Sequence, residues 1–135
     1  MNKKLKLSEI YTTVVFSLFI VVLTDAYAGF RFKAWGFFEV EKVEFTALFI
    51  ILGIYPAVAA MIINWYPYES VWWKKSGYFL GWSLFSTAYE WLCVKTGILW
   101  HIHWNLYYSF VLYLLIYYLF LILHVRIYRW MQKKE

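Results

Sequence analysis

The chain has 135 residues, which is room for one domain, and 64% of them are hydrophobic while only 16% are charged. Soluble domains carry about 25% charged residues, so this balance excludes a soluble core with a polar shell and indicates an integral membrane protein. The formal net charge of +5 does not indicate nucleic-acid binding, because the basic residues lie at the ends of hydrophobic runs, where membrane topology and anionic lipid headgroups explain them.

Four hydrophobic segments approach the length of about 20 residues that a membrane-spanning helix needs. They are expected at about residues 10–30, 45–64, 77–99 and 106–128. The predicted fold is therefore all-α, an integral membrane bundle of four transmembrane helices that forms a single domain over residues 1–135. The lipid bilayer is its first expected partner.

The first span can also be interpreted as a cleavable secretory signal. It has a lysine-rich start, an apolar stretch and a small-residue triplet at Ala26–Ala28. Cleavage would leave an odd number of spans and remove Asp25, so we expect the span to be retained. The mass of the mature protein distinguishes the two cases.

Two further features are expected to interrupt the helices. Pro56 lies within the second span, where a proline removes a backbone donor and kinks the helix. The connection over residues 31–44 mixes charged and aromatic residues, which predicts a short amphipathic segment in the outer interface.

The basic residues of the connections predict the orientation of the chain. Nine lie on the side of the termini and four on the opposite side, and the positive-inside rule then places both termini in the cytoplasm. The nine are Lys3, Lys4, Lys6, Lys74, Lys75, Arg126, Arg129, Lys133 and Lys134, and the four are Arg31, Lys33, Lys42 and Lys95. Tryptophan and tyrosine gather where the hydrophobic runs end, as in the aromatic belts of membrane proteins.

Glu90 is an ionisable residue in the interior of the third span. Helical spacing places it on one face with Ser83, Ser86, Cys93 and Gly97. A carboxylate at membrane depth costs about 2.5–3.5 kcal/mol on insertion scales, so it usually faces protein or water and has a partner. The sequence therefore predicts a polar site on this face.

A second carboxylate and a polar stripe are expected near Glu90. With a rise of about 1.5 Å per residue, Glu90 lies roughly 20 Å and Asp25 roughly 22 Å from the same membrane surface. In the fourth span Asn105, Ser109, Tyr113 and Tyr117 recur every four residues. The predicted pocket opens outward and is lined by Glu90, Asp25, Asn105, Ser109, His103 and Tyr113, with Arg31 and Lys95 as charge partners of the acids.

Other interpretations of these residues stay open. Glu90 can be a structural tie between helices, since buried polar side chains often only hold membrane helices together. His101 and His103, completed by Asp25, have the residue types of a metal site, but two histidines are too few to specify one, and neither a metal nor any other cofactor is expected. No nucleophile with an adjacent base is evident.

Several short motifs, ordered along most of the chain from Val22 to Tyr113, carry a resemblance to a known family. They are Leu23-Thr24-Asp25, Arg31, Trp35-Gly36-Phe37-Phe38, Leu52-Gly53-Ile54-Tyr55-Pro56, Asn64-Trp65-Tyr66-Pro67-Tyr68, Tyr89-Glu90-Trp91, Lys95-Thr96-Gly97, Trp104-Asn105 and Tyr108-Ser109. Together they resemble a family of small, uncharacterised multi-span membrane proteins of endospore-forming bacteria. The resemblance implies a bacterial cell-membrane location and brings no activity with it. Family members often have Tyr-Pro where this chain has Tyr113-Leu114, so the last helix is expected to be straighter here.

Three functions are weighed from these residues. The first is a non-enzymatic membrane protein that binds a small ligand, an ion or a partner helix at the pocket around Glu90. The second is a proton-coupled carrier or channel in which Glu90 titrates; it would require a homo-oligomer, because four spans enclose little volume for a transport path. The third is a membrane-embedded enzyme acting on lipid with Glu90 and His103 as acid and base.

Overall fold

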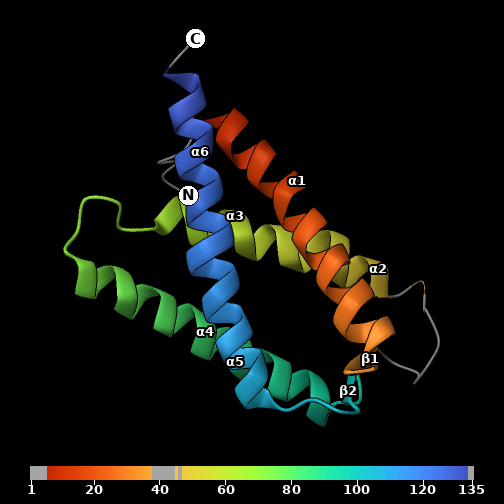
Figure 1. The fold of residues 1–135 in the computed structure, drawn as a ribbon. Helices are drawn as coiled ribbons and strands as arrows, with labels where there is room; N and C mark the ends of the chain where they lie inside the picture. The colour runs from red at the N-terminus through yellow and green to blue at the C-terminus, as the bar shows by residue number, and fades with distance from the viewer. Residues whose placement is uncertain (1–5, 38–44, 46, 134–135) are drawn as a thin grey trace.

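The computed structural model describes residues 6–37, 45 and 47–133, and this part of the chain is mostly helical (Figure 1). Its helical elements form four continuous segments, one for each expected span. The elements are α1 (Leu7–Thr24) with the π-helix η1 (Asp25–Arg31); α2 (Ala47–Phe49), η2 (Ile50–Ile54) and α3 (Tyr55–Trp65); α4 (Trp72–Lys95); and α5 (Leu106–Leu115), η3 (Ile116–Leu121) and α6 (Ile122–Gln132).

Two of the four segments are long and apolar enough to cross a membrane. They are Leu7–Gly29 and Leu106–Gln132, whereas Ile50–Trp65 is apolar but shorter. The segment α4 has 24 residues and the required length, but it includes lysines, serines and Glu90. Length and composition thus support membrane crossing most directly for the first and last helices.

The fold is not entirely α-helical, because two short strands pair at one end of the molecule. Strand β1 (Trp35–Phe37) lies antiparallel to β2 (Leu99–His101), with Trp35 opposite His101 and Phe37 opposite Leu99. Gly97 has a φ of +75°, which favours glycine, and it ends α4 so that the chain can turn into β2. Within the amphipathic segment expected over residues 31–44, residues 35–37 form a strand, and residues 38–44 lie outside the described part of the chain.

The predicted interruption at Pro56 takes the form of a π-helical turn. The N–H of Tyr55 donates to the carbonyl of Ile50, five residues back, and α3 then begins with Pro56 in its first turn. Pro56 has no backbone N–H, so the continuous helix lacks one hydrogen bond at this point, and the turn before it has the wider π form. The irregular backbone consequently precedes Pro56.

In the first and third helical segments the exposed face is apolar and the buried face is mostly polar, which is the reverse of helices in soluble proteins. The exposed face of α1 is apolar and consists of Leu7, Tyr11, Val15, Phe19 and Val22. Its buried face is mostly polar and consists of Glu9, Thr13, Ser17 and Ile20. In α4, Ser83 and Glu90 are buried while Leu84, Trp91 and Leu92 are exposed. A helix in water would bury the apolar face, so this arrangement is typical of helices surrounded by lipid.

The apolar core joins α3, α4 and the last helix. Ile62 and Ile63 of α3 are fully buried, and the Phe79 ring of α4 is only 2% exposed. That ring lies 5.2 Å from the ring of Tyr66 and 5.6 Å from the ring of Tyr118. Aromatic packing therefore fixes α4 against the end of α3 and the middle of the last helix.

A partly buried ion pair joins the first and the last helix. The Arg129 guanidinium donates from Nε to Oε1 of Glu9 at 2.6 Å, and the backbone N–H of Lys6 donates to Oε2 at 2.8 Å. The same guanidinium lies 4.4 Å from the Tyr68 ring centroid, and burial raises the pKa of that phenol, so the ring stays neutral. The start of α1, the end of α6 and the loop after α3 thus meet at one end, and the strand pair lies at the other (Figure 1).

Candidate functional site

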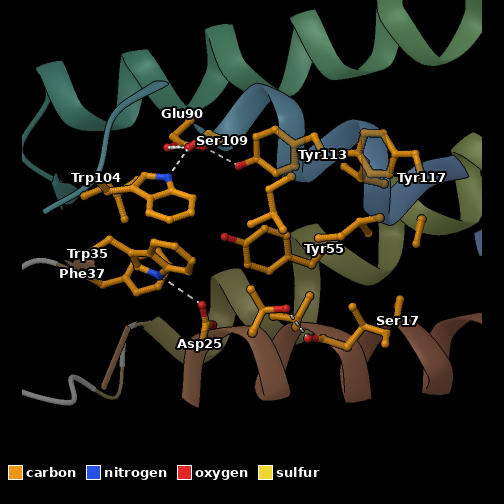
Figure 2. Close-up of a pocket in the computed structure, with 18 residues that line it drawn as sticks. Ser17, Asp25, Trp35, Phe37, Tyr55, Glu90, Trp104, Ser109, Tyr113 and Tyr117 are labelled. Carbon is orange, nitrogen blue, oxygen red and sulfur yellow. Dashed lines mark hydrogen bonds between the residues drawn. The ribbon is translucent and has the colours of Figure 1, made fainter. Parts of the chain in front are cut away.

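A cavity of about 100 Å³ lies between α1, α3 and α5, beside the strand pair (Figure 2). Among the described residues that line it, the charged side chains are Asp25 of η1 and Glu90 of α4, and there is no lysine, arginine or histidine. Six aromatic side chains contribute to its wall: Trp35, Phe37, Tyr55, Trp104, Tyr113 and Tyr117. A second cavity, of about 300 Å³, shares several of these residues and extends to Ser86 and Cys93.

Glu90 is the hydrogen-bonded centre of the site. The Tyr113 hydroxyl donates to its Oε2 at 2.6 Å, and the Ser109 hydroxyl donates to its Oε1. The His101 Nε2 lies 2.7 Å from the same Oε1. The side chain is only 8% exposed, so these contacts replace the water that a surface carboxylate would have. Glu90 therefore joins α4 to both α5 and β2.

Helix periodicity explains how α5 contributes to the site. Ser109, Tyr113 and Tyr117 follow one another at four-residue spacing and lie on one face of the helix. The first two reach Glu90, and the Tyr117 hydroxyl shares a hydrogen bond of 2.7 Å with Ser86, one turn before Glu90. The polar faces of α4 and α5 thus meet along their length, as the spacing of these residues predicts.

Asp25 lies on the opposite side of the cavity, and only one of its two carboxylate oxygens has a hydrogen-bond partner in the described residues. Its Oδ1 accepts a hydrogen bond of 3.1 Å from the indole N–H of Trp35. Its Oδ2 is buried and has no hydrogen-bond partner in the described part of the chain. A buried carboxylate oxygen without a donor is uncommon in proteins, and Asp25 is among the residues that line the cavity.

Two tryptophans connect the acids. The indole of Trp104 donates to Ser109 Oγ at 2.7 Å, and its ring packs edge-on against Trp35 with centroids 5.0 Å apart. Trp104 thus contacts the serine that donates to Glu90, whereas Trp35 donates to Asp25 directly. Tyr55 lies between Asp25 and Glu90, and its hydroxyl points into the cavity toward the two tryptophans (Figure 2). The wall between the acids is therefore aromatic.

Local backbone irregularities occur where the cavity residues are placed. Asp25 is the first residue of η1, Tyr55 follows η2 directly, and Tyr117 lies within η3. A π-helical turn rotates the residues beyond it relative to a regular helix, and such turns are frequent at functional sites. Three of the four helical segments place a cavity residue in this way.

The structure brings together Glu90, Asp25, Ser109 and Tyr113, four of the six residues expected to line the pocket. His103 is exposed and does not line either cavity, because β2 ends at His101 and the chain bends before it reaches His103. Asn105 is also exposed. Its side chain accepts a hydrogen bond from the Tyr108 N–H at 3.1 Å and caps α5.

The expected charge partners Arg31 and Lys95 are both exposed and line neither cavity. Asp25 instead accepts a hydrogen bond from the Trp35 indole. The Lys95 ammonium lies 6.0 Å from the centroid of the Trp91 ring. Long basic side chains near a helix end can extend to the surface, whereas the indole already lies at the cavity wall.

Four residues of the site were not predicted: His101, Trp35, Trp104 and Tyr55. Alternation in β2 places His101 on the same side as buried Leu99, while Trp100 between them is 47% exposed. Trp35 and Trp104 lie in connections interpreted as aromatic belts, and only the pairing of β1 with β2 brings them over the cavity. Tyr55 precedes Pro56, which was interpreted only as a kink.

The contacts of Ser109, His101 and Asp25 also bear on the nucleophile and the metal site considered for these residues. The Ser109 hydroxyl accepts from the Trp104 indole and donates to the Glu90 carboxylate. His101 contacts Glu90, whereas Asp25 contacts Trp35, and no three metal-binding side chains converge within the described residues.

The chain was compared with protein-family models, with curated proteins and with solved structures, and no match was found in any of the three.

Proposed function

We propose that this chain is a non-enzymatic, multi-pass membrane protein that binds a small ligand in the cavity between Asp25 and Glu90. The observation that carries the proposal is the cavity itself, where two carboxylates from different helices face a common space beneath the strand pair. A tie between helices needs no such space, because its partners would fill it.

The membrane setting is supported by the surface of the helices. Apolar side chains cover the outside of α1 and α4, and the polar side chains face inward. Basic residues Lys6 and Arg129 lie at the end where the termini meet, which supports a topology with both termini in the cytoplasm. The proposal includes four spans and the bacterial cell membrane, as the resemblance implies.

Ligand binding is tested by filling the cavity. Ala59 of α3 is 5% exposed and lines it, so Ala59→Leu places three more carbon atoms in the space. Ala57 lies on the exposed side of the same helix and lines neither of the two cavities, and Ala57→Leu is the matched control.

The measurement is a thermal-shift screen of the purified protein with compounds of about four to eight non-hydrogen atoms and cationic, neutral or anionic groups. A bound ligand stabilises the folded state, by about 1.4 kcal/mol at a concentration ten times its Kd. We expect some compounds to raise the melting temperature of the wild type and of Ala57→Leu, but not of Ala59→Leu. Equal shifts in all three proteins, or none in the wild type, would contradict the proposal.

A further inference from the structure

The lining of the cavity specifies the charge of the ligand it would take. Within the described part of the chain, the two charged lining residues, Asp25 and Glu90, are acidic, and no basic side chain lines the cavity. The two acids are not equivalent, however. Glu90 contacts three neighbouring side chains, whereas Asp25 is held by a single indole N–H.

The hydrogen-bond acceptor without a partner belongs to Asp25. Its Oδ2 is buried and has no hydrogen-bond partner in the described residues, while Oδ1 accepts from Trp35. An ionised carboxyl group offers only acceptors, so the missing partner has to be a donor. A donor that also carries positive charge makes the stronger hydrogen bond with a carboxylate.

The rest of the wall fits a cation with an apolar body. Trp35, Trp104 and Tyr55 line the cavity between the two acids (Figure 2), and aromatic faces attract cations. Aliphatic side chains complete the wall: Ile20, Val21, Val58, Ala59, Leu99, Leu112 and Ile116. These groups would exclude water and contact hydrocarbon.

The size of the cavity limits the ligand. A dry cavity of ~150 Å³ in another protein holds benzene, which has six non-hydrogen atoms. The cavity here measures about 100 Å³, which corresponds to a body of roughly four or five non-hydrogen atoms.

We infer that the ligand is a small protonated amine with a branched or compact hydrocarbon body. Its ammonium group donates to Oδ2 of Asp25, and its hydrocarbon part lies against the tryptophan pair and the aliphatic wall. This inference rests on the proposed function and names the chemical class of ligand for the same cavity.

Three probes of matched size test the charge requirement. Isobutylammonium, isobutanol and isobutyrate share the same branched four-carbon skeleton and differ in charge. Each is titrated into the full chain in nanodiscs of zwitterionic lipid by ligand-observed NMR, with empty nanodiscs as the blank. We expect isobutylammonium to bind the wild type at least roughly tenfold more tightly than isobutanol, and isobutyrate to show no binding.

Asp25→Asn removes the charge and keeps an oxygen that can accept from Trp35. It is expected to weaken isobutylammonium binding by roughly tenfold. Glu69→Gln neutralises an exposed acid outside the cavity and is expected to leave the affinity unchanged. Circular dichroism and gel-filtration elution show whether each variant is folded, and the comparison of the three probes on the wild type does not depend on either variant.

The outcomes separate this inference from the proposed function. Isobutanol binding as tightly as isobutylammonium, or an unchanged affinity in folded Asp25→Asn, would overturn the amine assignment while the cavity still binds a ligand. If none of the three probes binds the wild type, the amine assignment also fails, and the screen with Ala59→Leu decides the proposed function separately.

Discussion

Replacing Glu90 with leucine is expected to lower the free energy of unfolding by about 2–3 kcal/mol. Ser109, Tyr113 and His101 each lose the oxygen that they contact, and each is at least partly buried beside that oxygen. Hydrogen bonds between membrane helices average about 0.6 kcal/mol and reach about 1.7 kcal/mol, while a buried donor without a partner costs about 1–3 kcal/mol. Three such losses outweigh the gain from removing a buried carboxyl group.

The measurement is unfolding of the purified protein in mixed micelles with increasing SDS. Glu69→Leu is the control, because Glu69 is an exposed acid and its replacement should change the free energy by less than about 0.5 kcal/mol. If Glu90→Leu were as stable as the wild type, the contacts of Glu90 would not hold the helices together.

Replacing Phe79 with alanine is expected to lower the free energy of unfolding by about 3 kcal/mol. The ring is 2% exposed and packs against Tyr66, Tyr78 and Tyr118. Truncation of a buried phenylalanine typically costs 3–5 kcal/mol, and the lower end applies where lipid replaces water as the surroundings of the unfolded helices. Phe79 lines neither of the two cavities, so the folded variant should bind ligand as the wild type does.

Phe19→Ala is the matched control for this second variant. Phe19 lies on the outer face of α1 with 62% of its surface exposed, so its removal should cost less than about 1 kcal/mol. The same SDS titration compares the two. Equal destabilisation by the two replacements would contradict the assignment of Phe79 to the core and of Phe19 to the outer surface.

Helical spacing was sufficient to predict the meeting of α4 and α5. The contacts of Glu90 with Ser109 and Tyr113 depend only on periodicity within two helices, and periodicity can be read from sequence. The depth estimate for Asp25 also depended only on counting along a helix, and Asp25 and Glu90 line the same cavity.

Long-range pairing could not be predicted in the same way. Trp35 and His101 become neighbours because β1 pairs with β2 across 66 positions of sequence, and no local pattern specifies that partner. The prediction placed His103 in the pocket because a two-residue spacing does not reveal where a strand ends. Asn105 directly precedes an apolar helix, a position typical of a helix cap, and this signal was available.

Glu90 can both hold the helices together and line a binding site in this structure. Its hydrogen bonds hold α4, α5 and β2 together, and the cavity that it lines extends away from those contacts toward Asp25. The hydrogen-bonded Glu90 on one side and the unpaired oxygen of Asp25 on the other favour ligand binding, because the site is formed before the ligand arrives.

The most direct test of ligand binding in this cavity is the position of the indole N–H signals in nitrogen-15 NMR spectra during a ligand titration. The signals of Trp35 and Trp104 are assigned from single Trp→Phe variants, and those of Trp72 and Trp73, which are exposed at the start of α4 and line neither cavity, serve as the reference. With a compound that stabilises the wild type, the signals of Trp35 and Trp104 should shift with a common Kd while those of Trp72 and Trp73 stay in place. Shifts confined to Trp72 and Trp73, or unchanged Trp35 and Trp104 signals at saturating ligand, would contradict binding between Asp25 and Glu90.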